Sequence, residues 1–282
     1  MNFQDDIRVE HWKNEACPEL LFSSTSYERF HFENHFHNYY TVIRIRQGIN
    51  EGFTGKTGYR IGSGSILAIN PAAIHAGHSF GQDRLFFESV LFDDLLLKEV
   101  TSLLEITTPG DLLFQHDPIS DPILLELLDD LLRLSRIEHA GKSVFAAKLL
   151  FFERLISCYC LGPGQSKGAR QRAYLKRARA YLTEHYKEPV TLGQLASHAG
   201  ISPYHLSREF KRNFRQTPFE FLRNFRIEKS KEALVKEKLI IEIACELGFF
   251  DHSHFIKCFY RNSGTTPSAY KRLHPSARGP IV

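Results

Sequence analysis

The chain has 282 residues, of which 43% are hydrophobic and 24% are charged, which excludes disordered and fibrous proteins and suits about two globular domains. Its net charge of +4 divides unevenly, because residues 1–166 hold 14 basic against 22 acidic side chains and residues 167–282 hold 22 against 10. No apolar run reaches the ~18 residues that span a bilayer, the polar segment 1–15 lacks the pattern of a secretory signal, and the five scattered cysteines form no disulfide framework.

These properties favour a cytoplasmic protein with no membrane partner. A basic half joined to an acidic half indicates that only the second half meets a polyanion. Chance segregation of solvated faces is the alternative that charge by itself leaves open.

The segment 20–115 is predicted to form short strands. Residues 32–48 are rich in aromatic and β-branched side chains and end at a glycine turn, and residues 65–70 and 84–92 are further strand candidates. Many short strands with close turn signals favour a small barrel or sandwich.

Two stretches, 122–140 and 144–160, have apolar residues at helical spacing. They are dense in leucine and phenylalanine, so we expect a helical hairpin that either packs on the barrel or forms a dimer seam. Residues 161–168, with three glycines and one proline, are the clearest linker. The predicted domains are a barrel (1–118), the hairpin with the linker (119–165) and a basic helical domain (166–282).

The basic domain contains an internal repeat. Segment 190–222 is similar to segment 239–271, first at an offset of 48 residues and, after one inserted residue, at an offset of 49. The matched pairs are Leu192/Ile240, Leu195/Ile243, Ala196/Ala244, Gly200/Gly248, Leu206/Phe255, Phe210/Phe259, Thr217/Thr266, Pro218/Pro267 and Phe221/Tyr270.

Each repeat also has signals for a helix end and a new helix start. Gly200 and Gly248 mark ends that need a left-handed residue, and Ser202 and Asp251 are candidate N-caps for the helices that follow. The pattern predicts helix, tight turn and helix twice, joined by a long helix over about residues 218–236.

The second helix of each repeat has an apolar inner face and a polar outer face. The outward residues are Tyr204, Ser207, Arg208, Lys211 and Arg212 in the first repeat, and Ser253, His254, Lys257, Tyr260 and Arg261 in the second. Such side chains suit hydrogen bonding to base edges and phosphates in a major groove. A solvated polar face is the alternative for one such helix, but two in phase within a basic domain favour DNA.

The second repeat also carries a longer motif made of Ile240, Ile243, Ala244, Gly248, Phe249, Asp251, Ser253, Phe255, Phe259, Gly264, Thr266, Pro267 and Tyr270. With this motif, residues 172–273 resemble the AraC/XylS family of bacterial transcription regulators. The resemblance implies that both recognition helices enter successive major grooves on one face of promoter DNA.

The resemblance also implies roles for single residues. Tyr204, Ser207 and Arg208 would read bases from the first helix, and Ser253, His254 and Lys257 from the second. Arg212 and Arg261 would contact phosphates. Arg215 departs from the glycine that is usual in this turn, where the second repeat has Gly264; it either strains the turn or adds a phosphate contact.

The first half is more distantly similar to the cupin-type sensor domain of the same family, through His35-x-His37, Gly48 and the spacing of Gly64, Pro71 and His75. This resemblance implies a barrel pocket for a small effector. The expected lining residues are His35, His37, Tyr39 and His75, with the first three alternating onto one strand face together with Thr41. The alternative is that these histidines only bond to neighbouring loops.

Three histidines could in principle bind zinc or iron. However, Thr41 stands where metal-binding cupins have a glutamate, and Ser65 is not acidic. We therefore expect no bound metal and no other cofactor. The sequence also has no phosphate loop, G-x-S-x-G or H-E-x-x-H motif, so no catalytic residues are predicted.

The sequence thus predicts an α+β chain in which a cupin-like β-barrel with a helical hairpin precedes an all-α tandem helix-turn-helix domain. The predicted function is a DNA-binding transcription regulator controlled by a small effector, and the family favours activation. Double-stranded promoter DNA, the effector and RNA polymerase are the expected partners, with a homodimer as a further option. Two rival hypotheses stay open: a metal-dependent cupin enzyme with an accessory DNA-binding domain, and a module whose helical domain binds proteins.

Overall fold

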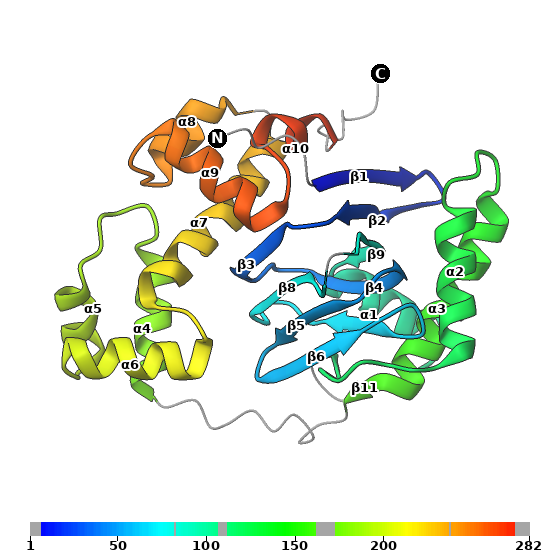
Figure 1. The fold of residues 1–282 in the computed structure, drawn as a ribbon, viewed down its shortest axis with the longest axis horizontal. Helices are drawn as coiled ribbons and strands as arrows, with labels where there is room; N and C mark the ends of the chain where they lie inside the picture. Colours follow the sequence, from blue (N-terminus) through cyan, green and yellow to red (C-terminus); the bar gives the residue numbers. More distant parts are fainter. Residues whose placement is uncertain (1–6, 82, 107–111, 162–172, 237, 274–282) are drawn as a thin grey trace. The chain divides into compact units, whose positions relative to one another are not determined.

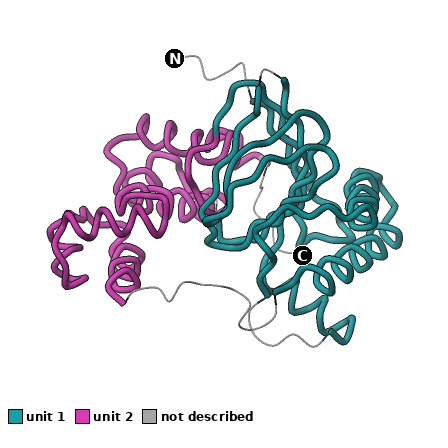
Figure 2. Tube along the Cα trace, turned by 60° about the horizontal axis from the view of Figure 1, so that its bottom comes forward, with its two compact units in different colours: residues 1–31, 37–167 teal, residues 32–36, 168–282 magenta. Residues whose placement is uncertain are grey.

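The computed structural model describes residues 7–81, 83–106, 112–161, 173–236 and 238–273. The chain forms two compact units, Met1–His31 with His37–Lys167 and Phe32–Phe36 with Gly168–Val282 (Figure 2). Apart from Leu161, the predicted linker lies outside the described residues. The functional boundaries at residues 118 and 165 stay predictions.

The sheet-rich part of the chain is built from two sheets (Figure 1). A five-stranded antiparallel sheet has the order β1 (Ile7–Asn14), β2 (Cys17–Tyr27), β9 (Leu85–Phe92), β4 (Tyr40–Gln47) and β7 (Ile66–Ile69). A four-stranded sheet has the order β3 (His31–His35), β8 (His75–Ser79), β5 (Asn50–Thr54) and β6 (Thr57–Ile61). The predicted strands at 65–70 and 84–92 are confirmed as β7 and β9.

The strand predicted over residues 32–48 is wrong in its middle. Strand β3 ends at His35 and β4 begins at Tyr40, and the two strands belong to different sheets. The chain turns from one sheet to the other between these strands, so the side chains of residues 32–48 cannot alternate between two faces as they would in one continuous strand. The predicted glycine turn is confirmed, because Gly48 has φ +80° and a Cβ there would lie 2.6 Å from the Arg84 carbonyl oxygen.

A helix interrupts the segment that was predicted as strands only. Helix α1 (Asp94–Leu103) starts at Asp93, whose side chain accepts a hydrogen bond from the Leu96 amide, and it buries Leu96, Leu97 and Val100. These three residues have helical spacing, so a signal was present in the sequence.

The two predicted hairpin helices are α2 (Pro122–Leu134) and α3 (Gly141–Tyr159), and a short strand pair, β10 (Leu113–Phe114) with β11 (Cys160–Leu161), lies beside them in the sequence. Their apolar residues share one core with the five-stranded sheet. Its members include Phe22, Val42, Val90, Phe92, Leu124, Leu128, Leu131, Phe151, Phe152 and Leu155. Of the two predicted arrangements, packing within the chain is what these residues show.

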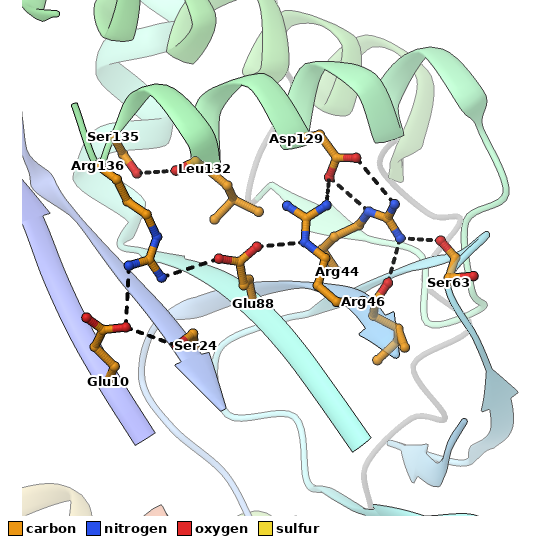
Figure 3. Close-up of polar contacts among 11 residues, drawn as sticks. Glu10, Ser24, Arg44, Arg46, Ser63, Glu88, Asp129, Leu132, Ser135 and Arg136 are labelled. Atoms are coloured by element: carbon orange, nitrogen blue, oxygen red, sulfur yellow. Dashed lines mark hydrogen bonds and ion pairs between the residues drawn. The ribbon is translucent and has the colours of Figure 1, made fainter. Parts of the chain in front are cut away.

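A network of ion pairs also joins α2 to the sheet (Figure 3). The contacts run through Glu10, Arg136, Glu88, Arg46, Asp129 and Arg44, with N···O distances of 2.6–3.4 Å. Glu88 and Asp129 each contact two arginines and Glu10 contacts Arg136, so three acidic groups face three basic groups and their charges balance. The network holds the polar side of α2 against β4 and β9 while its leucines enter the core.

The helical unit contains α4 (Ala173–Glu184), α5 (Leu192–Ala199), α6 (Pro203–Phe214), α7 (Pro218–Val235), α8 (Ile240–Glu246), α9 (His252–Ser263) and α10 (Pro267–Leu273). The two predicted helix-turn-helix units and the long joining helix are confirmed. Both turns have a left-handed glycine, Gly200 with φ +76° and Gly248 with φ +69°. No helix in the described parts of the chain is long and apolar enough to cross a membrane.

Candidate nucleic-acid interface and ligand pocket

Helix α6 presents a polar face because its start and its packing fix its orientation. The Ser202 side chain accepts a hydrogen bond from the His205 amide, Pro203 occupies the first helical position, and Leu206 is fully buried, as is Phe210 one turn later. The opposite side leaves Arg208, Lys211 and Arg212 exposed, Tyr204 77% exposed and Ser207 half-buried. The predicted outward residues of the first repeat therefore share one accessible face.

Helix α9 repeats this arrangement with different side chains. The Asp251 carboxylate accepts a hydrogen bond of 2.6 Å from the His254 amide, and Phe255 and Phe259 are fully buried. Ser253, His254, Lys257 and Arg261 are exposed, and Tyr260 is half-buried. The two faces have the same geometry and different hydrogen-bonding groups.

The Arg212 guanidinium lies beside a buried carboxylate. Its Nη1 is 3.4 Å from Glu209 Oε1, and the Glu209 side chain, which is 2% exposed, also accepts a hydrogen bond of 3.3 Å from the Tyr174 hydroxyl. The Arg212 side chain is 67% exposed, so its other nitrogens are open to an anion.

Arg215 ends α6 in a strained conformation. It has φ +51° and ψ +15°, in the left-handed region, while Gly264 ends α9 with φ +69°. An L-residue with a side chain adopts this region only at a cost of about 1–2 kcal/mol. Of the two predicted consequences of Arg215, a strained turn is present, and the phosphate contact stays a prediction.

Replacing Arg215 with glycine should therefore raise the free energy of unfolding of the helical unit by about 1 kcal/mol. Far-UV circular dichroism during urea unfolding measures this change. The converse substitution, Gly264→Ala, should lower stability by a similar amount. A loss of stability in Arg215→Gly would contradict the strain. If Arg215 also contacts phosphate, the variant weakens binding to all DNA sequences alike.

Two arginines that the sequence analysis did not single out bond to the ends of the helices before the turns. Arg177 on α4 donates from Nη2 to the Ala199 carbonyl (2.6 Å), and Arg226 on α7 donates from Nη1 to the Gly248 carbonyl (2.6 Å). Burial lowers the pKa of Arg226 from its ordinary value, although an arginine stays charged in proteins. The residues are 49 apart, whereas the adjoining part of the repeat has an offset of 48, so the repeat did not mark them as a pair.

In the first unit, three of the predicted effector-binding residues lie together. The His37 ring stacks on the Tyr39 ring, with centroids 4.2 Å apart, and meets the His75 ring edge-on at 4.7 Å. His37 Nδ1 is 2.7 Å from the Tyr39 carbonyl oxygen, and His75 Nδ1 is 2.9 Å from the Ala73 carbonyl oxygen. Such bonds to neighbouring backbone are what the alternative hypothesis expected, and they fix both imidazoles by the Nδ1 side.

His35 is described separately, because residues 32–36 group with the second unit. It is buried, and its Nδ1 is 2.7 Å from the Glu33 carbonyl oxygen. The predicted alternation of His35, His37 and Tyr39 on one strand is wrong, since His37 and Tyr39 follow the end of β3. Within the described ranges, no group of three or more His, Cys, Asp or Glu side chains could hold a metal ion.

Two buried polar residues of β5 were not predicted from the sequence, and one of them, Thr54, lies beside this cluster, whereas Asn50 pairs with Ser79 at the other end of the strand. Thr54 pairs with His75 across the sheet, and Asn50 lies on the same face of β5 four residues earlier. Among the described residues, Thr54 Oγ1 and Asn50 Oδ1 have no hydrogen-bond partner although both side chains are buried. Unpaired buried oxygens of this kind call for water or a ligand.

The neighbouring Tyr59 closes one side of this region. Its hydroxyl donates to the Ala76 carbonyl oxygen (3.2 Å), and burial raises its pKa above the ordinary value, so it stays a neutral donor. Glycines make space for the ring, since a Cβ at Gly52 would lie 2.8 Å from the Tyr59 hydroxyl. Two surface cavities of the first unit, of about 360 and 430 Å³, have none of the predicted effector residues in their walls.

Comparison with known proteins gave consistent matches for both units. Residues 18–154 match the model of the AraC-like ligand binding domain, and residues 195–273 match a helix-turn-helix domain. The uncharacterized HTH-type transcriptional regulator YbfI of Bacillus subtilis is 30% identical over 79% of this chain and 81% of its own length. The HTH-type transcriptional activator RhaS of Klebsiella pneumoniae is 22% identical over 84% and 86%.

Among solved structures, ToxT from Vibrio cholerae O395 has a similar fold. It aligns with a TM-score of 0.52 and 15% identity, covering 95% of this chain and 98% of its own. The relatives named here are regulators rather than enzymes.

Proposed function

Because this chain belongs to the AraC-like family of helix-turn-helix transcription regulators, with a ligand-binding domain and a DNA-binding domain, we propose that α6 and α9 read the bases of its operator. Tyr204, Ser207 and Arg208 act from α6, and Ser253, His254 and Lys257 from α9. The observation that carries the proposal is the pair of exposed polar faces, each on a helix that starts with a capped N-terminus after a left-handed glycine.

Arg212 and Arg261 contact phosphates in this proposal. Both are exposed in the last turn of their helices, beyond the residues that reach base edges. Contacts to phosphate orient a protein on the duplex and carry no direct sequence information.

The decisive test is DNA selection by the purified full-length chain from a random duplex library, followed by titration of the selected duplex at several salt concentrations. Two separated half-sites and a steep fall of affinity with salt are expected, with each phosphate contact adding about 0.9 to the log–log slope. A flat salt dependence, or no enrichment of any sequence, would support the rival hypothesis of a protein-binding module.

The small effector binds in the first unit beside His37, Tyr39 and His75, where Thr54 offers an unused hydrogen-bonding oxygen. The unpaired buried Oγ1 of Thr54, which pairs with His75 across the sheet, supports this site. His35 was predicted to line the same pocket, but it groups with the second unit and is not part of this proposed site. The effector alters transcription only if it binds one conformation of the chain more tightly than another, because only then does it change the population of the DNA-binding conformation.

A compound that raises the melting temperature of the wild-type chain and changes its operator affinity should bind about tenfold more weakly to Thr54→Val and His37→Ala. The loss of one buried hydrogen bond is the physical reason. His78→Ala is the control, because His78 lies on β8, the strand of His75, but on its opposite face, with 42% of its side chain exposed. Equal weakening of compound binding in His78→Ala, or no weakening in Thr54→Val and His37→Ala, would contradict effector binding at this cluster.

We further propose activation as the sign of regulation, RNA polymerase as a partner, the cytoplasm as the location and a homodimer as an assembly. Activation rests on relatives such as RhaS, which is named an activator. Chemical cross-linking at working concentration tests the homodimer, and transcription in vitro from the selected operator with purified RNA polymerase tests activation and the polymerase partner.

A further inference from the structure

Each repeat of the helical unit includes one helix more than its helix-turn-helix pair. Helix α4 precedes α5 and α6, and α7 precedes α8 and α9, so each repeat has three helices. Arg177 on α4 donates to the Ala199 carbonyl at the end of α5, and Arg226 on α7 donates to the Gly248 carbonyl in the turn after α8. Both repeats therefore have a guanidinium bonded at or beside the turn.

Arg226 differs from Arg177 in one respect. Besides the Gly248 carbonyl, it donates from Nε to the Tyr186 carbonyl (2.7 Å) and from Nη2 to the Glu188 carbonyl (2.9 Å). Tyr186 and Glu188 lie in the connection between α4 and α5, which belongs to the first helix-turn-helix repeat. One guanidinium thus joins the first repeat to the turn of the second repeat.

The close approach of these segments depends on Gly248. A Cβ there would lie 2.9 Å from Arg226 Nη2 and 3.0 Å from the Lys187 carbonyl oxygen, and the glycine has φ +69°. The α4–α5 connection, the α8–α9 turn and the Arg226 side chain therefore meet at one point. Helix α9 begins four residues after Gly248, so its direction follows from the position of this turn.

We propose that Arg226 is a positioning residue that sets the separation and angle between α6 and α9, and so selects one spacing between the two half-sites of the operator. This rests on the proposed function, in which both helices read DNA. Without Arg226, the two helix-turn-helix repeats are joined by α7 and its apolar contacts, and the second repeat gains freedom to pivot. A looser link lowers the effective concentration of the second helix at its half-site.

Arg226→Lys tests the proposal because lysine keeps the positive charge but cannot span three carbonyls as a planar guanidinium does. The full-length variant is titrated with the duplex selected by the wild-type chain, with duplexes lengthened or shortened by one base pair between the half-sites, and with a duplex that keeps one half-site. One base pair turns the second half-site by about 35°.

The expected result is about tenfold weaker binding to the selected duplex, a smaller penalty for altered spacing, and at most roughly twofold change on the single half-site. Arg177→Lys is the matched control, since it removes a comparable bond within the first helix-turn-helix repeat. It should keep the wild-type spacing preference. Thermal unfolding of both variants shows how much stability each loses.

Wild-type spacing preference in Arg226→Lys would overturn the proposal. Equal weakening on the selected and single-half-site duplexes would do so too, since it would reflect a folding defect alone. If Arg226→Lys does not fold, Arg226→Gln is used, which keeps two donors on a neutral side chain. A wild-type chain that selects no two-part site would instead contradict the proposed function.

Discussion

Replacing Arg208 with alanine should cost about 1–3 kcal/mol of binding free energy on the selected operator and relax the base preference at one position. Arg208 lies exposed on α6, two residues after the buried Leu206, and its guanidinium suits a bidentate contact with a guanine edge. Competition between the selected duplex and single-base variants measures both effects.

Arg212→Ala is the matched control on the same helix. It should weaken binding to every sequence alike and reduce the salt slope by about 1, because a phosphate contact carries no base information. If both variants bind as the wild type does, α6 is not a recognition helix. If Arg212→Ala changes base preference and Arg208→Ala does not, the two roles are reversed.

Phe152→Ala should lower the free energy of unfolding of the first unit by about 3–5 kcal/mol. Phe152 on α3 is fully buried, and its ring meets Phe92 of the sheet edge-on, with centroids 4.8 Å apart. Removing the ring leaves a cavity in the core that joins the hairpin to the sheet. Fluorescence of Trp12 during urea unfolding measures the loss, because it is the chain's single tryptophan and it stacks on Phe22 of the same sheet.

Leu150→Ala is the control on the same helix, since Leu150 is 52% exposed. Its expected effect is within about 0.5 kcal/mol. A loss of several kcal/mol in Leu150→Ala, together with a change of oligomeric state, would show that α3 buries its outer face in a dimer. The predicted dimer seam would then be present in addition to the internal packing.

The helical unit was predictable because its signals are local. Gly200, Ser202 and Asp251 each specify a helix boundary within a few residues, and the buried Phe210 and Phe259 follow from helical spacing. The roles of the outer faces followed from the resemblance to a family. Arg226 escaped notice because its three acceptors are backbone carbonyls 22 to 40 residues away along the chain.

The sheet-rich unit was predicted as a class but not in detail. The chain passes from one sheet to the other between His35 and Tyr40, and only tertiary structure decides where that happens. Asn50 and Thr54 have no distinctive sequence pattern, because what marks them is the lack of a partner for a buried oxygen among the described residues. The histidines were predictable from the resemblance to a family, whereas the buried polar residues of β5 were not.

The unlike faces of α6 and α9 have a further consequence for gene control. A symmetric dimer presents the same surface to DNA whichever way its palindrome is read. In the proposed function, one chain carries Arg208 on one recognition helix and Lys257 on the other, which would give its binding site a polarity. The bound protein would then present a fixed side to the nearest promoter, and inverting the operator in place would turn that side away.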